Sequence, residues 1–486
     1  MELRTFREAK ETIILKILLY NWVQFDNKEK AGGGVSVYIK NLIEYLIKDK
    51  NNTIYFLSSG NKYNPSVPEP YIQKSKNIFG NKCHTYEVIN SDIIGPLGTL
   101  CWDLDRYLED TRTTKIMEDF IKQNGPFDII HIHNIGGFGQ NFLRMKEKFP
   151  NTKFIFDLHN YNCFCMNSYL FNQEKKILCN NYHCGQDCLT CYSRIGASEN
   201  LYKNRVKLFW KDHLFSKLIY KFQHGFKNLY KNNYKQYYVT TYKNCRCDAQ
   251  SYVKFRENNI KYINDNFDII LAVSQKVKDV AINYGLDAEK IKVSYIGTKF
   301  AENAKPPKVY DSNKKFKIAY MGYANTLKGF FFLTEALSSI PEEIAKNIDI
   351  VFAAKGAKEK FVKEKLSNFH SVEVFNGYTH ENIQSILQDV TLGIVPVLWD
   401  DNLPQVAIEI VSNGIPILCS NLGGASELST SELFKFEGGN IEAFKNKLIY
   451  LIQNPSELQQ YWIHHNGLMT MDKHIKILEQ IYKENN

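Results

Sequence analysis

The sequence predicts an α/β protein built from two doubly wound domains that face a central cleft. Its 486 residues are too many for one ordinary hydrophobic core, and a hydrophobic content of 44% supplies material for two. Short runs rich in Ile, Val and Leu alternate along the chain with helical periodicities. That alternation is typical of parallel sheets covered by helices on both faces.

The predicted strands fall into two series, one in each half of the chain. The first series consists of residues 13–20, 53–57, 127–132, 153–158, 268–273 and 291–296. The second series consists of residues 316–321, 349–354, 372–375, 391–397 and 417–420. We place the boundary in the polar stretch 301–315, because Pro306 and Pro307 interrupt regular structure there. The predicted domains are therefore 1–300, with an insertion at about 160–262, and 301–470.

Composition excludes several classes of protein. No run approaches the roughly 18 apolar residues that span a bilayer. The start of the chain carries Glu2, Glu8 and Glu11, where a signal peptide carries only bases. A cytoplasmic location with reduced thiols is therefore expected. The net charge of +9 is mild for this length and no nucleic-acid-binding domain is recognised, so nucleic acid is not an expected partner.

The segment from Asp401 to Glu409 carries the strongest functional signal. Pro404 suits the first turn of a helix, Asn402 or Asp401 can cap that helix, and Gly414 supplies its stop. Glu409 is then expected about two turns into a short helix. Exposed N–H groups at the helix start favour a diphosphate between the two carboxylates, where one acid can bind ribose hydroxyls and the other can face a sugar. The pattern predicts a nucleotide-sugar site.

This block resembles the signature of the retaining glycosyltransferases of family 4, which have the GT-B fold. The family pattern E-x7-E, its Gly-x-Pro turn and its Gly-Gly-x-x-Glu loop correspond here to Asp401-x7-Glu409, 413–416 and 423–427. Asp401 keeps the charge of the family's glutamate but is one methylene shorter. The resemblance implies that Asp401 acts at the sugar, that Glu409 binds the ribose, and that a last helix at 471–486 returns to the first domain. It also implies donor contacts from the helix start, which comprises Asn402, Leu403, Pro404 and Gln405.

A glycine-rich turn follows the first predicted strand. Gly33 and Gly34 precede an apolar-periodic helix, and glycines at a strand-to-helix turn let the backbone approach an anion closely. The spacing is not that of a dinucleotide-binding fingerprint, and a flexible surface loop is the plain alternative. In the family that the chain resembles, the corresponding pair lies over the donor diphosphate, which implies that role for Gly33 and Gly34.

Histidines end two of the predicted strands. Ligands of open α/β sheets bind outside the carboxyl ends of strands, where His133 and His159 would project. His131 alternates with His133 and is expected to be a core or turn residue. His159 matches the family's strand-end histidine that faces the transferred sugar. The resemblance therefore implies a catalytic role for His159.

The second domain opens with a segment that resembles the family's phosphate clamp, Gly-Arg-x4-Lys-Gly. Lys328 matches the clamp lysine and is the expected catalytic cation, whereas Tyr323 stands in the place of the arginine. A phenol cannot replace a bidentate guanidinium, so the lost charge must come from elsewhere or the leaving group is less well stabilised. Tyr378 follows the strand at 372–375, and the resemblance implies that it contacts the nucleotide base.

A cysteine cluster follows His159. Four of its thiols lie close enough in sequence to enclose a tetrahedral structural zinc, namely Cys179, Cys184, Cys188 and Cys191. An iron–sulfur cluster and plain free thiols are the alternatives, since the spacing is not that of a standard finger. His183 lies inside the set, with Cys163, Cys165, Cys245 and Cys247 outside it. No cofactor is expected for catalysis itself.

A basic aromatic segment at 201–246 continues the insertion. Its lysines meet almost no acid, while Phe, Trp and Leu recur at helical spacing. An amphipathic surface that touches anionic lipid on the inner face of the cytoplasmic membrane is one interpretation. A pair of packing helices with a solvated lysine face is the equal alternative, and RNA binding is a third.

Together these features predict transfer of a sugar from a nucleoside diphosphate sugar to a hydroxyl of a growing, lipid-linked glycan. The family resemblance implies that the transfer proceeds with retention and without a catalytic metal. The leaving diphosphate would be stabilised by preorganised electrostatics. The competing hypothesis is a non-catalytic GT-B-like subunit that binds a partner enzyme, which Tyr323 and Asp401 favour and Glu409, Lys328 and His159 disfavour. Sugar epimerisation on the same fold lacks its own acid/base signature here.

Overall fold

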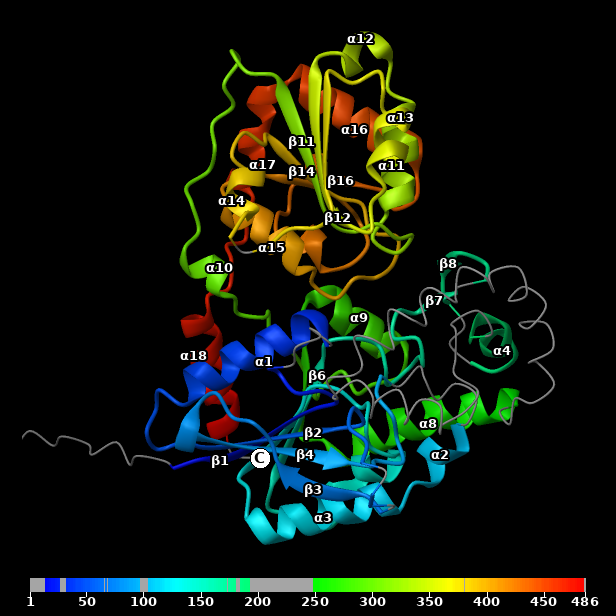
Figure 1. The fold of residues 1–486 in the computed structure, drawn as a ribbon, viewed down its shortest axis with the longest axis vertical. Coiled ribbons are helices and arrows are strands. Elements are labelled where there is room, and N and C mark those ends of the chain that lie inside the picture. Colours follow the sequence, from blue (N-terminus) through cyan, green and yellow to red (C-terminus); the bar gives the residue numbers. More distant parts are fainter. Residues whose placement is uncertain are drawn as a thin grey trace, which may run out of the picture.

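A computed structural model describes most of the chain (Figure 1). The described residues are 14–26, 32–64, 66–67, 69–96, 104–172, 174–180, 184–192, 248–379 and 381–484. The basic aromatic segment at 201–246 lies outside these ranges, so the membrane-contact hypothesis stays a prediction. His183, Cys245 and Cys247 also lie outside them. Within the described residues, no helix is long and apolar enough to cross a membrane.

The first half of the chain forms an eight-stranded sheet with the order β10-β9-β6-β5-β1-β2-β4-β3. Its strands are β1 (Lys16–Asn21), β2 (Thr53–Ser59), β3 (Tyr71–Lys74), β4 (Cys83–Ile89), β5 (Ile129–Ile132), β6 (Lys153–Leu158), β9 (Ile269–Ala272) and β10 (Ile291–Val293). Every pairing is parallel except that of β3 with β4. The central strands are buried along their whole length, as parallel strands between two helical layers must be.

Helices and short segments cover this sheet and connect its strands. They are α1 (Gly33–Leu46), α2 (Leu104–Glu109), α3 (Arg112–Asn124), α8 (Ala249–Asn266), α9 (Gln275–Asn283) and α10 (Lys299–Glu302), with the 3-10 segments η1 (Gly80–Lys82) and η3 (Gln140–Glu147). The cysteine region carries the hairpin of β7 (Phe171–Asn172) and β8 (Ile177–Leu178) and the short helix α4 (Gln186–Tyr192). Buried side chains at helical spacing, such as Tyr38, Leu42 and Leu46, fix the face of α1 that packs on the sheet.

The second half forms a six-stranded, fully parallel sheet with the order β13-β12-β11-β14-β15-β16. Its strands are β11 (Phe316–Tyr323), β12 (Ile348–Lys355), β13 (Ser371–Phe375), β14 (Leu392–Val395), β15 (Ile417–Ser420) and β16 (Lys435–Phe436). Its helices are α11 (Phe330–Ser338), α12 (Glu342–Ala345), α13 (Glu359–Lys365), α14 (Ile383–Ile386), α15 (Gln405–Ser412), α16 (Ile441–Gln453) and α17 (Gln459–Ile463). The 3-10 segments are η5 (Gly424–Glu427), η6 (Glu432–Phe434) and η7 (Pro455–Leu458).

The last helix, α18 (Met471–Lys483), packs against the first half of the molecule beside α1 (Figure 1). The Thr470 side chain caps its N-terminus by accepting from the backbone N–H of Lys473. Its buried face reaches the first sheet, where the Lys153 ammonium donates to the carbonyl of Ile481 at 3.0 Å. The C-terminal end of the chain is thereby joined to the sheet that its beginning forms.

The predicted fold class is confirmed, whereas the exact domain limits stay a prediction. All eleven predicted strands are present, and those at 153–158 and 417–420 have the predicted bounds. The sequence analysis missed β3, β4, β7, β8 and β16. Most of the missed strands are two to four residues long, and β4 mixes buried residues with the half-exposed His84 and Tyr86, which hides its periodicity.

Candidate active site at the start of α15

The loop before α15 joins the two halves of the molecule. The Asn402 side-chain amide donates to the carbonyl of Leu158, at the end of β6, over 3.2 Å. The Asn402 carbonyl in turn accepts from the hydroxyl of Ser274 at 2.7 Å. The prediction that Asn402 or Asp401 caps α15 is therefore wrong. Pro404 occupies the cap position without a side-chain bond, because Asn402 is engaged across the interface and Asp401 is engaged by a lysine.

Asp401 and Lys328, both predicted catalytic residues, meet directly. The Lys328 ammonium lies 2.5 Å from Asp401 Oδ2 and 5.4 Å from the ring centroid of Trp399. The carboxylate is buried, while about a third of the lysine side chain is exposed. The loop that holds Asp401 is tight, because the N–H of Gly424 donates to the Asp401 carbonyl, and a Cβ at Gly423 would lie 2.2 Å from that same oxygen.

Glu409 lies on the buried face of α15, in the fifth position of the helix rather than two full turns into it. The Tyr378 hydroxyl donates to Glu409 Oε2 at 2.6 Å. Burial, followed by the charge of Glu409, raises the pKa of the Tyr378 phenol well above its usual value. Tyr378 therefore orients the carboxylate through its hydroxyl, and the predicted contact of its ring with a nucleotide base stays a prediction.

The glycine turn before α1 reaches the same place. Gly32 and Gly33 have φ values of +83° and +54°, in the left-handed region that favours glycine. The Gln405 side-chain amide donates to the carbonyl of Gly34 at 3.2 Å, and a Cβ at Gly34 would lie 3.1 Å from that side chain. The first residue of α15 thus touches the glycine turn, while Leu403 and Pro404 are buried in the loop behind it.

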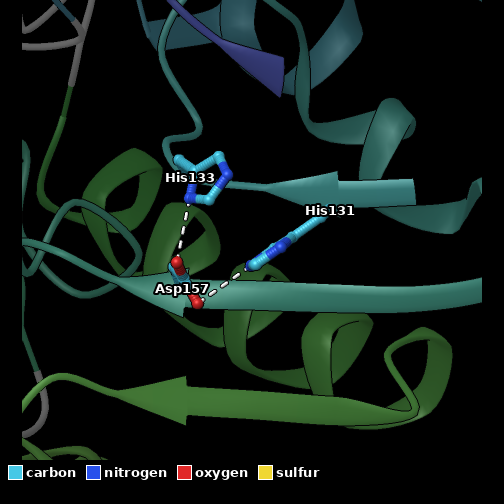
Figure 2. Close-up of side chains that lie close together, drawn as sticks. All are labelled: His131, His133 and Asp157. Atoms are coloured by element: carbon cyan, nitrogen blue, oxygen red, sulfur yellow. Dashed lines mark hydrogen bonds and ion pairs between the residues drawn. The ribbon is translucent and has the colours of Figure 1, made fainter. Parts of the chain in front are cut away.

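Three histidines lie around Asp157 at the first sheet, and Figure 2 shows two of them, His131 and His133. His131 Nε2 lies 2.9 Å from Asp157 Oδ1, while His133 Nδ1 and His159 Nε2 lie 2.9 Å and 3.1 Å from Oδ2. His131 is buried, as expected, but His133 does not project to the rim, because its side chain is fully buried. His159 follows the end of β6, and its side chain is 5% exposed.

The surroundings favour the neutral form of His133 and the charged form of Asp157. Burial lowers the pKa of the His133 imidazole to about 3, and the neighbouring His131 adds to the effect. Burial by itself raises the pKa of Asp157, yet the charge and hydrogen bonds of His131 and His133 hold that pKa well below its usual value. At neutral pH the cluster therefore contains a carboxylate and a neutral His133.

The sequence analysis missed Asp157 as a site residue. The available signal was the alternation at two strand ends. His133 follows β5 two residues after His131, and His159 follows β6 two residues after Asp157, so within each pair the side chains share a face. Among the described residues, His131, His133 and Asp157 form the group whose ligand atoms lie close enough together for a metal, all within 4.8 Å of one another.

The cysteines do not form such a group in the described part of the chain. Cys184 Sγ lies 3.2 Å from Cys188 Sγ, while Cys191 Sγ faces the carbonyl of Phe171 at 3.8 Å. The carbonyl of Cys179 accepts from the hydroxyl of Tyr284. None of the four forms a disulfide within the described part of the chain. The structural zinc stays a prediction.

Tyr323 is exposed at the carboxyl end of β11, where the predicted clamp lacks its arginine. Lys355 is its register partner at the end of β12, and the Lys355 ammonium lies 6.0 Å from the Tyr323 ring centroid. The sequence analysis did not single out Lys355. The pairing of β11 with β12 brings its positive charge to the position where one is missing.

Comparisons with known proteins bear on both halves. Residues 302–466 match the model of the family described as Glycosyl transferases group 1. A 130-residue stretch is 29% identical to Protein CapJ of Staphylococcus aureus, covering 26% of this chain and 33% of that protein, so the match spans about a third of this curated relative.

Solved structures resemble the whole fold. Sucrose-phosphate synthase of Thermosynechococcus elongatus gives a TM-score of 0.56 at 12% identity, covering 96% of this chain and 98% of that one. Anabaena Alr3699/HepE in complex with UDP-glucose gives 0.53 at 13%, covering 97% and 100%. A trehalose-6-phosphate structure from E. coli bound with UDP-2-fluoro glucose gives 0.50 at 11%, covering 97% and 96%.

These matches confirm the resemblance to the group 1 glycosyl transferases and agree with the predicted enzyme class, glycosyltransferase. The residue assignments are not tested by them. The matched range contains the loop after β11, the loop before α15 and α15 itself. Lys328, Asp401 and Glu409 therefore all belong to the matched part. The chain therefore contains a glycosyl transferases group 1 domain, carried on a two-sheet fold of the GT-B type.

Proposed function

We propose that this protein transfers a glycosyl group from a nucleoside diphosphate sugar to a hydroxyl of a growing, lipid-linked glycan, with retention at the anomeric carbon. The observation that carries the proposal is the convergence at the start of α15. The Lys328–Asp401 pair, the glycine turn at Gly34 and the end of β6 all meet the 401–405 loop there. Each of these features suits one part of a nucleotide-sugar donor.

The nucleotide is assigned to the side of Glu409. A buried carboxylate held by a phenol is a preorganised acceptor for ribose hydroxyls, and its position on α15 sets it one turn from the diphosphate. Two of the similar structures hold UDP-sugars, HepE with UDP-glucose and the E. coli structure with UDP-2-fluoro glucose. UDP-glucose is therefore the first donor to test.

The leaving diphosphate is assigned to Lys328, the N–H groups at the start of α15 and the turn at Gly33 and Gly34. A diphosphate at this point competes with Asp401 for the lysine ammonium. Its arrival would release Asp401 toward the sugar while Lys328 neutralises the charge that develops as the glycosidic bond breaks. His159 is assigned to the sugar side, because it follows Leu158, whose carbonyl accepts from Asn402 in the 401–405 loop.

The acceptor is proposed to lie on the side of the first half and to be a glycan carried by a lipid. The support is the cysteine region next to His159 and the basic aromatic composition of 201–246, which suits an anionic membrane surface. The protein would then act in the cytoplasm, at the inner face of the membrane.

Titration calorimetry with UDP, UDP-glucose and the matching GDP and ADP compounds tests the donor part. We expect one nucleotide series to bind with micromolar affinity and the others to bind far more weakly. A mass-spectrometric assay for release of free sugar from the bound donor then tests turnover without requiring the acceptor. Binding of no nucleotide at all would refute the donor site.

A non-catalytic subunit is the second candidate, favoured by Tyr323 at the arginine position and by the neutralisation of Lys328. It predicts that a nucleotide can bind but that the donor is never cleaved, even with membrane extract supplied as acceptor. Donor cleavage that depends on Lys328 would exclude it.

A further inference from the structure

Asp157 is the centre of a buried polar network whose purpose the proposed donor site does not explain. β5 and β6 pair in parallel with His131 opposite Ile155 and Ile132 opposite Phe156, which places His133 beside Asp157. His159 follows the end of β6, two residues after Asp157, so both side chains lie on the same face. The Asp157 carboxylate therefore contacts three imidazoles: those of His131 and His133, drawn in Figure 2, and that of His159, the predicted catalytic histidine.

The two carboxylate oxygens of Asp157 contact different histidines. Oδ1 faces His131 Nε2, and the other ring nitrogen of His131 lies 2.8 Å from the hydroxyl of Tyr482. Oδ2 faces His133 Nδ1 and His159 Nε2, which also lie 3.3 Å from each other. A carboxylate can only accept, so the nitrogen of His159 that faces it is favoured in its N–H form. The lone pair of the His159 ring then resides on Nδ1.

Helix α18 closes the network from outside. It contributes Tyr482 to His131 and His474 to Tyr38, whose hydroxyl lies 2.7 Å from His474 Nε2. The Tyr38 ring in turn packs on His159 with 5.0 Å between the ring centroids. The end of the chain thereby holds both neighbours of the histidine, Asp157 through His131 and Tyr38 directly.

We propose that Asp157 is a positioning residue that fixes the orientation and the Nε2–H tautomer of His159, and that α18 stabilises this arrangement through Tyr482 and His474. The proposal deepens the proposed function and rests on it, because His159 is assigned there to the sugar side. With the tautomer fixed, His159 presents an unprotonated Nδ1, which can accept a hydrogen bond from a sugar or acceptor hydroxyl. Metal binding by His131, His133 and Asp157 is the competing interpretation.

The first measurement does not depend on activity. Nitrogen-15 NMR of the histidine rings, with the His159 signals assigned through His159→Gln, reports which ring nitrogen carries the proton. We expect the Nε2–H form in the wild type and a mixture of tautomers in Asp157→Asn. A wild-type His159 protonated at Nδ1, which is the form that accepts from His133, would overturn the proposal, and so would an unchanged tautomer in Asp157→Asn.

The second measurement is turnover of the donor that binds. Asp157→Asn is expected to lower kcat at least tenfold with less than a threefold change in the KM for the donor, because the nucleotide contacts lie elsewhere. Tyr482→Phe removes only a hydroxyl and keeps the buried ring, so it covers the case in which Asp157→Asn fails to fold. We expect Tyr482→Phe to lower kcat about threefold, in the same direction.

A second His–Asp pair provides a matched control. His370 Nδ1 lies 2.6 Å from Asp349 Oδ1 at the opposite end of the second sheet, where β12 and β13 begin. Asp349→Asn should leave kcat and the His159 signals unchanged. Equal losses in Asp157→Asn and Asp349→Asn would reduce the effect to general destabilisation and overturn the proposal.

Elemental analysis separates the competing interpretation. About one equivalent of a transition metal in the wild type, absent from Asp157→Asn, would make Asp157 a ligand and overturn the positioning role. If the wild type cleaves no nucleotide sugar, the proposed function fails by itself. The tautomer comparison still decides whether Asp157 fixes His159.

Discussion

At the scale of single residues, the contact between Lys328 and Asp401 could not be inferred from the motifs that contain them. Both groups were expected to act on the donor separately, yet their charged atoms lie 2.5 Å apart. A lysine–carboxylate pair with one buried partner holds its geometry, because separating it would leave a desolvated carboxylate without its counter-charge. Under the proposed function, the donor would replace Asp401 at Lys328, and Asp401 would become available only when the diphosphate is bound.

Glu409 gives the first prediction at this scale. Glu409→Ala should weaken donor binding by tenfold or more, because a hydrogen bond to a charged group is worth roughly 1.5–3 kcal/mol. Tyr378→Phe keeps the carboxylate and loses only the bond that orients it, so we expect a loss of about threefold. Calorimetric dissociation constants of the folded variants measure both. Equal losses in the two variants would mean that Glu409 acts only through Tyr378.

Lys355 gives the second prediction. If it supplies the charge that Tyr323 cannot, Lys355→Ala should lower kcat about tenfold, and Lys328→Ala should lower it by considerably more. Lys360 on α13 is an exposed control with a similar charge, and Lys360→Ala should have no effect. Adding Tyr323→Arg to Lys355→Ala should restore much of the rate. Absence of that rescue in a folded double variant would show that the lost charge is not what matters.

At the scale of secondary-structure elements, the sequence predicted strands well and local contacts poorly. Buried parallel strands such as β6 and β15 are continuous apolar runs with clear limits, so their bounds follow from composition. The predicted cap of α15 was wrong because capping depends on contacts that composition does not reveal. Asn402 and Asp401 have the right residue types for capping, but their partners, Leu158 and Lys328, are far away in sequence.

The same contrast applies to the candidate site. The motif residues Gly34, Lys328, Asp401 and Glu409 could be named from the family resemblance, and the structure brings the first three to the start of α15. The alternation of Asp157 with His159 was visible in the sequence, but a carboxylate near the end of an apolar strand does not by itself indicate a site. Its three histidine partners become visible only when the register of β5 and β6 is known.

Helix α18 gives the third prediction, which concerns pH. Burial lowers the pKa of His474 to about 4, against about 6.5 in an unfolded chain. Below pH 6.5 the unfolded state therefore binds a proton that the folded state does not, so stability falls as the pH falls from about 6.5 to about 4. The slope from this residue is about 1.4 kcal/mol per pH unit. The charge of Asp157 raises the pKa of His474 and so opposes this shift, whereas His131 and His159 lower that pKa further.

Urea unfolding at pH 7, 6 and 5 measures this slope. His474→Gln cannot take up the proton and should reduce the slope by about 1.4 kcal/mol per pH unit, which leaves the contribution of the buried His133 in place. Tyr38→Phe removes the hydroxyl that contacts His474 but keeps the imidazole, so it should lower stability at every pH and leave the slope unchanged. A wild-type slope retained in His474→Gln would assign the pH dependence to another group.

At the scale of the whole molecule, the two halves are joined by contacts that concentrate around the candidate site. The second half reaches the first through the loop before α15 and through η5, while α18 returns from the other side. Residues at these junctions belong to neither sheet. Their positions depend on how the halves sit together, so the geometry of the donor site is a property of the complete fold and not of the matched domain alone.

Glu427 carries the fourth prediction. Its carboxylate accepts from the backbone N–H groups of Gln275 and Lys276, at 2.9 and 2.7 Å, and from the Tyr295 hydroxyl at 2.7 Å. The carboxylate that accepts these hydrogen bonds thus comes from the second half, and the groups that donate them come from the first. Two of the donating N–H groups lie at the N-terminus of α9, where the helix dipole favours a negative charge. Removing it leaves three donors without a partner and takes away a contact that fixes the relative position of the halves.

Glu427→Ala should therefore lower the free energy of unfolding by about 2–4 kcal/mol, because hydrogen bonds to charged groups are among the stronger ones. Glu427→Gln keeps one acceptor and should lose about half as much. Affinity for the nucleotide sugar should also fall in Glu427→Ala, although the Glu427 side chain touches none of the residues predicted to bind it. The reason is that Gly34 and Gln405, both predicted to bind the nucleotide sugar, come from opposite halves. Urea unfolding, small-angle scattering and calorimetry on the same preparations measure stability, shape and binding. Lost stability with unchanged scattering and unchanged donor affinity would show that Glu427 only caps α9 and that other contacts hold the halves in register.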